Sequence, residues 1–154
     1  VKSYLLRAQI PRDIIDVKER RMSGNRDHIV QRMKELYVYD LYGLRRELKP
    51  LSQVLYTGEP LNCFATGVME GLRRLLAVTD SRVIIIGNHI GSPSDIDIIP
   101  RNDITEHSAT KKLFASSIEF KTSTGAHYVL TAVSRRVLDL FNWALDQPIK
   151  EFDE

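Results

Sequence analysis

The side chains that most often do chemistry are few in this chain, and their spacing matches no catalytic or metal-binding pattern. The one cysteine, Cys63, lies in an apolar stretch that lacks the flanking residues of a nucleophile motif. The histidines His28, His89, His107 and His127 are far apart, whereas two ligands on one helix need a spacing of four residues. We therefore expect Cys63 to be a small buried side chain, and we expect a noncatalytic protein without metal or other cofactor.

Asp95 and Asp97 are separated by one residue, which places both carboxylates on one face of a strand. Paired carboxylates serve acid–base catalysis or bind a cation. The alternation with Ile96 and Ile98 is more typical of a half-buried strand whose acidic face meets solvent. A hydrolytic or metal-dependent enzyme that uses this pair, Cys63 or the histidines is the least favoured hypothesis.

Basic residues suggest a different chemistry, the binding of anions. Two arginines open a predicted helix that begins after Ser134, where cations oppose the positive end of the helix dipole. A predicted polar loop over residues 109–112 carries two lysines that could join them if the fold brings the segments together. The candidate anion- or partner-binding residues are Arg73, Arg74, Lys111, Lys112, Arg135 and Arg136.

Charge divides the chain into two parts. Residues 1–50 hold 12 basic and 7 acidic residues, a net charge of +5, whereas residues 51–154 hold 10 and 13, a net charge of −3. The contrast indicates two units that pack together, or a basic segment that meets an acidic partner. The second possibility leads to the alternative function, an anionic-surface binder that contacts acidic lipid headgroups or nucleic acid through the basic N-terminal segment.

The N-terminal part has the apolar spacing of helices. A long helix is predicted to begin near residues 25–27 and to end at Pro50, with a bend at Gly43. Its apolar stripe either packs on the domain that follows or forms an interface with a partner or a second copy. The candidate interface residues are Ile29, Met33, Leu36, Tyr37, Leu41 and Leu44.

After residue 50 the pattern changes to short strands. A hairpin at its centre joins Leu75–Thr79 to Val83–Ile86 through a turn at Asp80–Ser81, and the second of these strands is predicted to be buried on both faces. The strand pattern starts with a short stretch over residues 54–56, which precedes a turn, and the other strands are predicted over residues 62–68, 95–100, 104–108, 118–121 and 127–133. Pro148 closes the final amphipathic helix, and an acidic tail follows. Seven strands and one closing helix favour a partly open barrel.

Composition is ordinary for a globular protein, with 43% hydrophobic and 27% charged residues. No apolar run approaches the roughly 20 residues of a spanning helix, and the first residues do not form a signal-peptide pattern. A single cysteine fits a reducing compartment, so we expect a cytoplasmic protein. The predicted division is a helical extension over residues 1–50, a domain over residues 51–148 and a tail over residues 149–154.

This order of elements resembles the pleckstrin-homology (PH) superfold, and in particular the bacterial PH-like family of the YokE type. The matching residues are Gly58-Glu59, Thr66-Gly67, the run Leu75–Ile86 with Thr79-Asp80-Ser81-Arg82 at its turn, Asp97–Pro100 with Ile104, and Phe120 with Thr124-Gly125. The resemblance spans residues 51–147 and implies two near-orthogonal antiparallel sheets capped by the C-terminal helix.

The resemblance also implies a noncatalytic domain that binds or scaffolds through protein–protein contact or self-association, because related bacterial domains form homo-oligomers. Eukaryotic PH domains bind phosphoinositides through a basic loop between the first two strands. Here that loop is predicted over residues 69–74, where Arg73 and Arg74 are accompanied by Glu70.

Overall fold

The structure of the protein is a computed structural model that describes residues 26–36, 45–87, 95–113 and 116–152. A helix over residues 26–35 and the helix α3 (Arg45–Val54) precede seven strands and a last helix, α4 (Arg135–Asp146). The strands are β1 (Leu61–Met69), β2 (Leu72–Thr79), β3 (Arg82–Gly87), β4 (Asp95–Pro100), β5 (Ile104–Thr110), β6 (Ser116–Thr122) and β7 (His127–Val133), with a short 3-10 helix, η1 (Arg101–Asp103), between β4 and β5.

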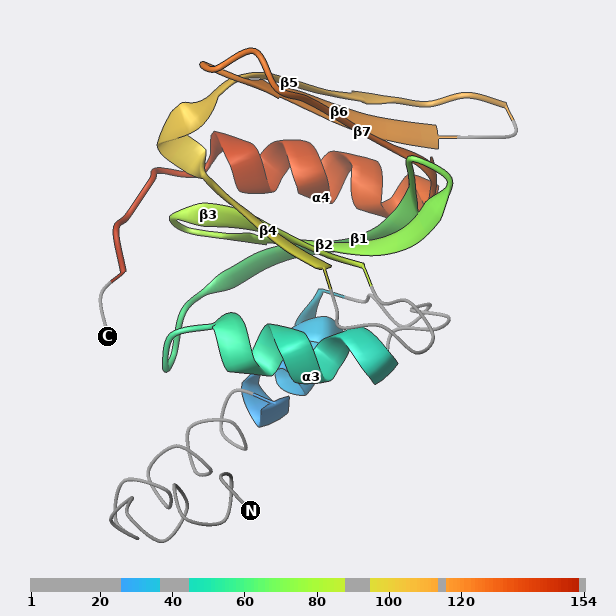
Figure 1. Cartoon of the computed structure of the whole chain (residues 1–154). Coiled ribbons are helices and arrows are strands. Elements are labelled where there is room, and N and C mark those ends of the chain that lie inside the picture. Colours follow the sequence, from blue (N-terminus) through green and yellow to red (C-terminus); the bar gives the residue numbers. More distant parts are fainter. Residues whose placement is uncertain (1–25, 37–44, 88–94, 114–115, 153–154) are drawn as a thin grey trace, which may run out of the picture.

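The seven strands form one antiparallel sheet in the order β4-β3-β2-β1-β7-β6-β5. The sheet folds over so that β1–β4 and β5–β7 lie on opposite sides of α4 (Figure 1). It does not close, because no described strand joins β4 to β5, which are its two edges. The predicted PH-like architecture, a partly open barrel with a C-terminal helix, is confirmed.

The two halves of the sheet meet where β1 crosses β7, at the pairing of Val68 with Thr131. Gly67 makes this close crossing possible. A Cβ atom at Gly67 would lie 2.4 Å from the Thr131 carbonyl oxygen and 2.7 Å from Leu130 Cγ. A larger residue would therefore force the two strands apart.

The predicted central hairpin is present as β2 and β3, which pair from Val78–Val83 to Arg74–Gly87. Every residue of β3 is buried, as predicted for a strand covered on both faces. The Thr79 side chain fixes the turn, because its Oγ1 accepts hydrogen bonds from the backbone N–H groups of Ser81 (3.2 Å) and Arg82 (3.1 Å).

The sheet carries a hydrophobic core on each of its faces. The first core lies between the two halves of the sheet and contains the buried face of α4, represented by Leu138 and Phe141. The second core lies on the other face of β1–β3, where Phe64 and Ile84 pack with Ile29 and Leu51. The helix over residues 26–35 and α3 form the layer below that face (Figure 1).

Two predictions around Pro50 are wrong. Pro50 does not end a helix but lies inside α3, and residue 54 is the last of that helix rather than the start of a strand. A proline inside a helix costs about 3 kcal/mol because it removes a backbone hydrogen bond and clashes with the preceding turn. Complete burial of Leu51 and Leu55 in the second core offsets this cost.

The prediction of a half-buried β4 is also wrong. The first four residues of β4 are all exposed, including Ile96 (39%) and Ile98 (48%), and only Ile99 is buried. Their register partners on β3, Ile86 and Ile84, are fully buried. The helical layer thus covers β3 but leaves the adjacent edge strand open.

Candidate functional site

The predicted loop between the first two strands is much shorter than expected. Only Glu70 (φ 53°) and Gly71 (φ 77°) form the turn, and both adopt the positive φ values of a two-residue hairpin. Arg73 and Arg74 are therefore residues of β2. The prediction of a loop over residues 69–74 is therefore wrong in its bounds, because the turn needs only two residues.

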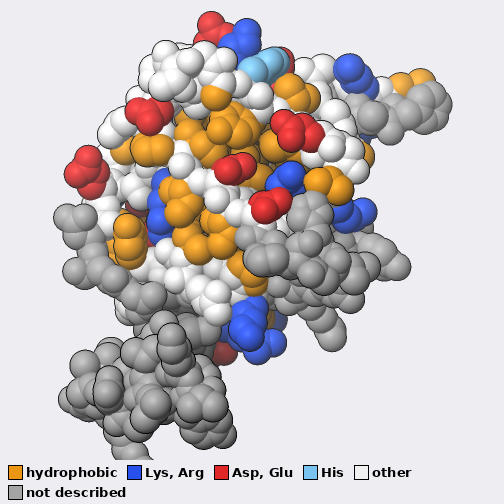
Figure 2. Space-filling view, in the orientation of Figure 1, with side chains coloured by type: hydrophobic (Ala, Val, Ile, Leu, Met, Phe, Trp, Pro, Cys, Tyr) orange, Lys and Arg blue, Asp and Glu red, His pale blue; other side chains and the backbone are white. Residues whose placement is uncertain are grey.

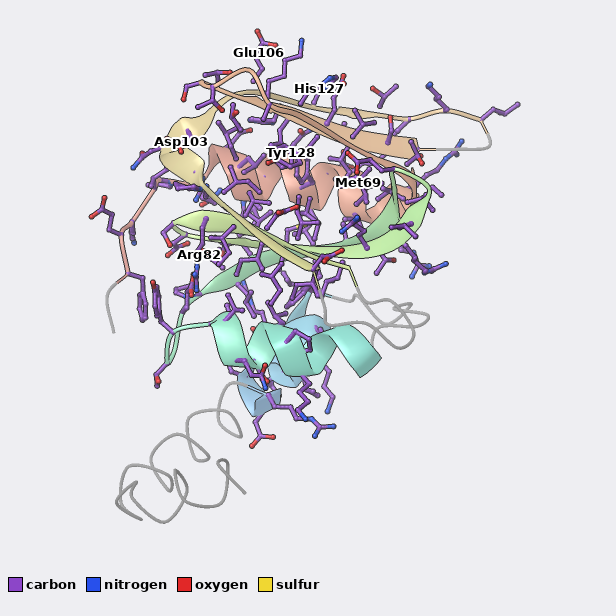
Figure 3. All side chains as sticks on the ribbon, in the orientation of Figure 1. Met69, Arg82, Asp103, Glu106, His127 and Tyr128 are labelled. Atoms are coloured by element: carbon purple, nitrogen blue, oxygen red, sulfur yellow. The ribbon has the colours of Figure 1, made fainter. Side chains whose placement is uncertain are left out.

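Arg74 lies beside a cavity of about 430 Å³. Its guanidinium covers Gly87, where a Cβ atom would lie 2.6 Å from Arg74 Nη1. Arg74 Nε is buried and has no hydrogen-bond partner within the described part of the chain. The cavity is lined by Met69, Glu70, Arg74, Asp97, Ala126, His127, Tyr128 and Val129, so two carboxylates share it with the arginine. Three of the lining residues, Met69, His127 and Tyr128, are labelled in Figure 3.

The fold does bring Lys111 and Lys112 to the start of α4. Arg135 Nη2 donates hydrogen bonds to the carbonyl oxygens of Lys112 (3.1 Å) and Leu113 (3.4 Å). Lys111 Nζ lies 3.9 Å from Asp139 Oδ2. Ser134 occupies the N-cap position, although its side chain makes no capping hydrogen bond. The binding of anions by this group, with Arg136, remains a prediction.

The described part of the predicted interface stripe packs within the chain. Ile29 is fully buried in the second core, and Met33 and Leu36 pack against it. Polar contacts attach the same helix to the domain, since Arg32 Nε donates to the Leu61 carbonyl (2.6 Å) and His28 Nε2 lies 3.1 Å from the Glu59 carbonyl oxygen. Tyr37, Leu41 and Leu44 lie outside the described residues.

The candidate chemical groups are separated or buried. Cys63 is fully buried, and burial raises the pKa of its thiol. His107 and His127 pair with the exposed acids Asp146 (3.4 Å) and Glu119 (2.9 Å), and His89 lies outside the described residues. Within the described part of the chain, no three His, Cys, Asp or Glu side chains gather in a way that could hold a metal ion.

Sequence reasoning did not assign a role to a buried ion pair between Glu59 and Arg82. Arg82 donates to both Glu59 carboxylate oxygens, at 2.9 and 2.6 Å, and to the Val54 carbonyl at 2.7 Å. Its guanidinium also stacks over Tyr56, 4.4 Å from the ring centroid. Glu59 and Arg82 both belong to the motifs on which the family resemblance rests, and this shared membership was the sequence signal that could have pointed to the pair.

Sequence reasoning also missed Arg101, a buried residue of η1. Its guanidinium donates to four backbone carbonyls, those of Thr79 (3.3 Å), Asp80 (3.0 Å), Leu145 (3.0 Å) and Gln147 (2.6 Å). Burial lowers the pKa of Arg101, and the Asp80 carboxylate opposes that shift. Arg101 thereby joins the β2–β3 turn to the end of α4. No local pattern marks it.

The β4 edge, defined as Asp95, Ile96, Asp97 and Ile98, differs from the rest of the sheet in its exposure. No other described strand pairs with its outer side, and two aliphatic side chains there meet solvent. Hydrophobic side chains gather across the middle of the face in Figure 2, with acidic side chains among them. Exposed apolar groups beside an open strand edge are the features that bind other chains.

Comparison with known protein families places most of the described domain in one of them. The family described as bacterial PH domain matches residues 55–146, which is more than half of the chain. The match begins at the residue after α3, ends at the last residue of α4 and includes all seven described strands. No match to the chain was found among curated proteins. No helix of the described residues is long and apolar enough to cross a membrane.

Proposed function

Because the chain belongs to the bacterial PH domain family, we propose that it is a noncatalytic module that binds a protein partner at the β4 edge. The observation that carries this proposal is the exposure of Ile96 and Ile98 on a strand that no described segment covers. Their neighbours on β3 are fully buried, so the second core stops one strand short of the sheet's edge. A partner that covers β4 would extend that core.

A selection with displayed random peptides tests this function. Peptides selected on the full chain are then compared for binding to the variants Ile98→Lys and Leu113→Lys. Leu113 is the matched control, because it is another exposed aliphatic residue (79%) and lies on the β5–β6 connection. We expect to find peptides that still bind the Leu113→Lys control but no longer bind the Ile98→Lys variant. A selection in which every peptide binds both variants equally would refute the proposal.

The proposal has three finer parts. The YokE-type assignment is supported by the Thr79-Asp80-Ser81-Arg82 turn, and the cytoplasmic location by the lone buried cysteine. Self-association is the third, and light scattering of the full chain measures it. A dimer mass that persists in the Ile98→Lys variant would place the contact between copies outside the β4 edge.

Arg74 supports a second candidate function, the binding of an anionic headgroup. Its buried Nε lies beside a cavity and lacks a partner among the residues that the structure describes, and such a donor can take a phosphate or carboxylate oxygen. The test compares vesicles of phosphatidylserine and phosphatidylcholine with vesicles of phosphatidylcholine alone, over a salt series. Binding that is equal for the wild type and for Arg74→Gln at low salt would remove this candidate.

A further inference from the structure

We propose that the β4 edge binds its partner by strand addition, and that the bound segment alternates basic and aliphatic residues. This inference rests on the proposed function and makes it specific. It names the partner by chemistry: an extended segment of about six residues in which every second side chain is Lys or Arg and the others are aliphatic. Three features of β4 support it, namely its free backbone groups, its two faces and its charge.

The first feature is the direction of the backbone groups. The Arg101 N–H donates to the Ser81 carbonyl (2.9 Å), and this pair lies one step beyond the Arg82–Pro100 pair in the register. Hydrogen-bonded and non-bonded pairs alternate along an antiparallel ladder. Ile99 and Asp97 therefore bond to β3, whereas the N–H and C=O groups of Ile96 and Ile98 point away from it.

Pro100 agrees with this assignment. It occupies a position equivalent to Ile96 and Ile98, where a strand makes no hydrogen bond to β3. Proline has no N–H and is tolerated in a sheet only where no ladder bond is lost. The outer side of β4 thus offers the donors and acceptors of two residues to an incoming chain.

The second feature is the segregation of side chains on the two faces of β4. Asp97 pairs with Ile85, which faces the first core, whereas Ile98 pairs with Ile84, which faces the second core. Residues directly opposite on adjacent strands share a face, with Cβ atoms about 4.5–5.5 Å apart. An added strand therefore places one set of side chains beside Asp97 and the alternate set beside Ile96 and Ile98.

The third feature is charge, which determines the kind of side chain that an added strand would place beside Asp97. Asp97 is exposed and has no ion pair among the described residues. Glu70 and Arg74 share its cavity, so two carboxylates face one guanidinium there. A basic side chain beside Asp97 would balance this excess, and an aliphatic one beside Ile98 would extend the second core. A second copy of β4 fits poorly, because an antiparallel pair centred on Asp97 would oppose two aspartates.

The test uses the full chain and four capped six-residue peptides labelled for fluorescence anisotropy. The probe is Lys-Val-Lys-Val-Lys-Val. The matched control, Lys-Lys-Lys-Val-Val-Val, has the same composition and charge without the alternation. Two further peptides replace every Lys with Ser or with Glu. We expect the alternating basic peptide to bind at least tenfold more tightly than each of the other three.

Amide hydrogen exchange shows whether binding adds a strand. With the alternating basic peptide bound, we expect exchange at Ile96 and Ile98 to slow by at least tenfold, because their N–H groups gain partners. Exchange at Asp97 and Ile99 should change little, because these amides already bond to β3. Binding without slower exchange at Ile96 and Ile98 would overturn strand addition.

A charge swap tests the basic half of the pattern. Asp97→Lys should weaken binding of the Lys-Val peptide about tenfold and allow the Glu-Val peptide to bind. Glu106→Lys makes the same change on the other edge strand, β5, and should leave both affinities unchanged. Asp97 is exposed, so the variant should fold, and an unchanged thermal melting curve checks this.

The outcomes separate this inference from the proposed function. If the Ser-Val or Glu-Val peptide binds as tightly and slows the same amides, the charge assignment is wrong and β4 remains the contact surface. If none of the four peptides binds while displayed peptides still depend on Ile98, the alternating pattern is wrong and the proposed function stands. If the selection also finds no dependence on Ile98, both fail.

Discussion

Two arginines, Arg101 and Arg74, show how differently the two ends of the β2–β3 hairpin are built. Arg101 is buried at the turn end and donates hydrogen bonds to four carbonyls from two segments of the chain, the β2–β3 turn and the end of α4. Arg74 lies at the other end, over Gly87, and its buried Nε donates to no group of the described residues. Among the described residues, the buried guanidinium at the turn end therefore has its partners, and the one at the other end does not.

The same contrast continues beyond the arginines. At the turn end, Glu59 and Arg82 satisfy each other in a buried ion pair. At the other end, β4 leaves Ile96 and Ile98 exposed. Buried polar groups in folded proteins nearly always have partners, which is the arrangement at the turn end, whereas the open end carries the surface that we propose for binding.

The largest expected difference in the free energy of unfolding comes from replacing each of these two arginines with methionine. Arg101→Met should lower the free energy of unfolding by about 3 kcal/mol, because buried carbonyls lose a charged donor. Arg74→Met should change it by less than about 0.5 kcal/mol, or raise it, because no hydrogen bond is lost. Urea unfolding followed by circular dichroism measures both. Equal losses would contradict the contrast between the two ends.

A pair of isoleucines that are register partners gives the next effect. Ile84 is fully buried on β3, and Ile98 lies opposite it on β4 with 48% exposure. Ile84→Ala should destabilise the chain by about 2–4 kcal/mol, and Ile98→Ala by less than about 1 kcal/mol. The same urea titrations apply. A large loss at Ile98 would mean that this residue supports the fold and is not reserved for a partner.

A smaller effect is expected where the turn end meets solvent. Tyr56 lies under the Arg82 guanidinium and stacks on Phe152, with ring centroids 6.3 Å apart. Tyr56→Leu should cost about 1 kcal/mol, because it removes a cation–π contact and an aromatic stack. Phe152→Leu removes only the stack and should cost less. If the two variants lose equal stability, the cation–π contact contributes nothing.

The smallest effect concerns Glu119. Its carboxylate has hydrogen-bond partners, as the Arg101 guanidinium does, but it is in contact with solvent, as the β4 edge is. Hydrogen bonds from His127 and Ser108 lower the pKa of its carboxyl. A lowered pKa in the folded state gives stability above the ordinary pKa, and that stability disappears as pH falls through the folded value. His127→Ala should raise the pKa of Glu119 toward its ordinary value in a carboxyl NMR titration. An unchanged pKa would show that the pair is not formed in solution.

The strand order and the central hairpin could be predicted because they depend on local signals. Turn residues at Asp80 and Ser81 and continuous aliphatic residues over 83–86 determine that region without reference to the rest of the chain. Alternation at Asp95–Ile98 also predicted a strand correctly. It did not predict exposure, because periodicity says that two faces differ but not whether another layer reaches both.

The site was less accessible to sequence reasoning, since its features depend on distant contacts. Arg101 receives its role from residues more than 20 positions earlier and more than 40 later. Pro50 is tolerated in α3 because of burial against strands that follow it. Arg74 was assigned to a loop because sequence spacing gave no measure of how few residues the β1–β2 turn requires. Each of these outcomes depends on tertiary packing rather than local preference.

The position of α4 has a consequence for how the chain folds during synthesis. This helix follows all the described strands in the sequence. Its Leu138 and Phe141 nevertheless complete the first core, and the Leu145 carbonyl near its end accepts a hydrogen bond from Arg101. The second core needs only residues between Ile29 and Ile86 among its buried members. As the polypeptide leaves the ribosome, the helical layer and β1–β3 can associate first, whereas β5–β7 must wait with an uncovered apolar face until the last helix emerges. That interval is when the nascent chain is most exposed to aggregation.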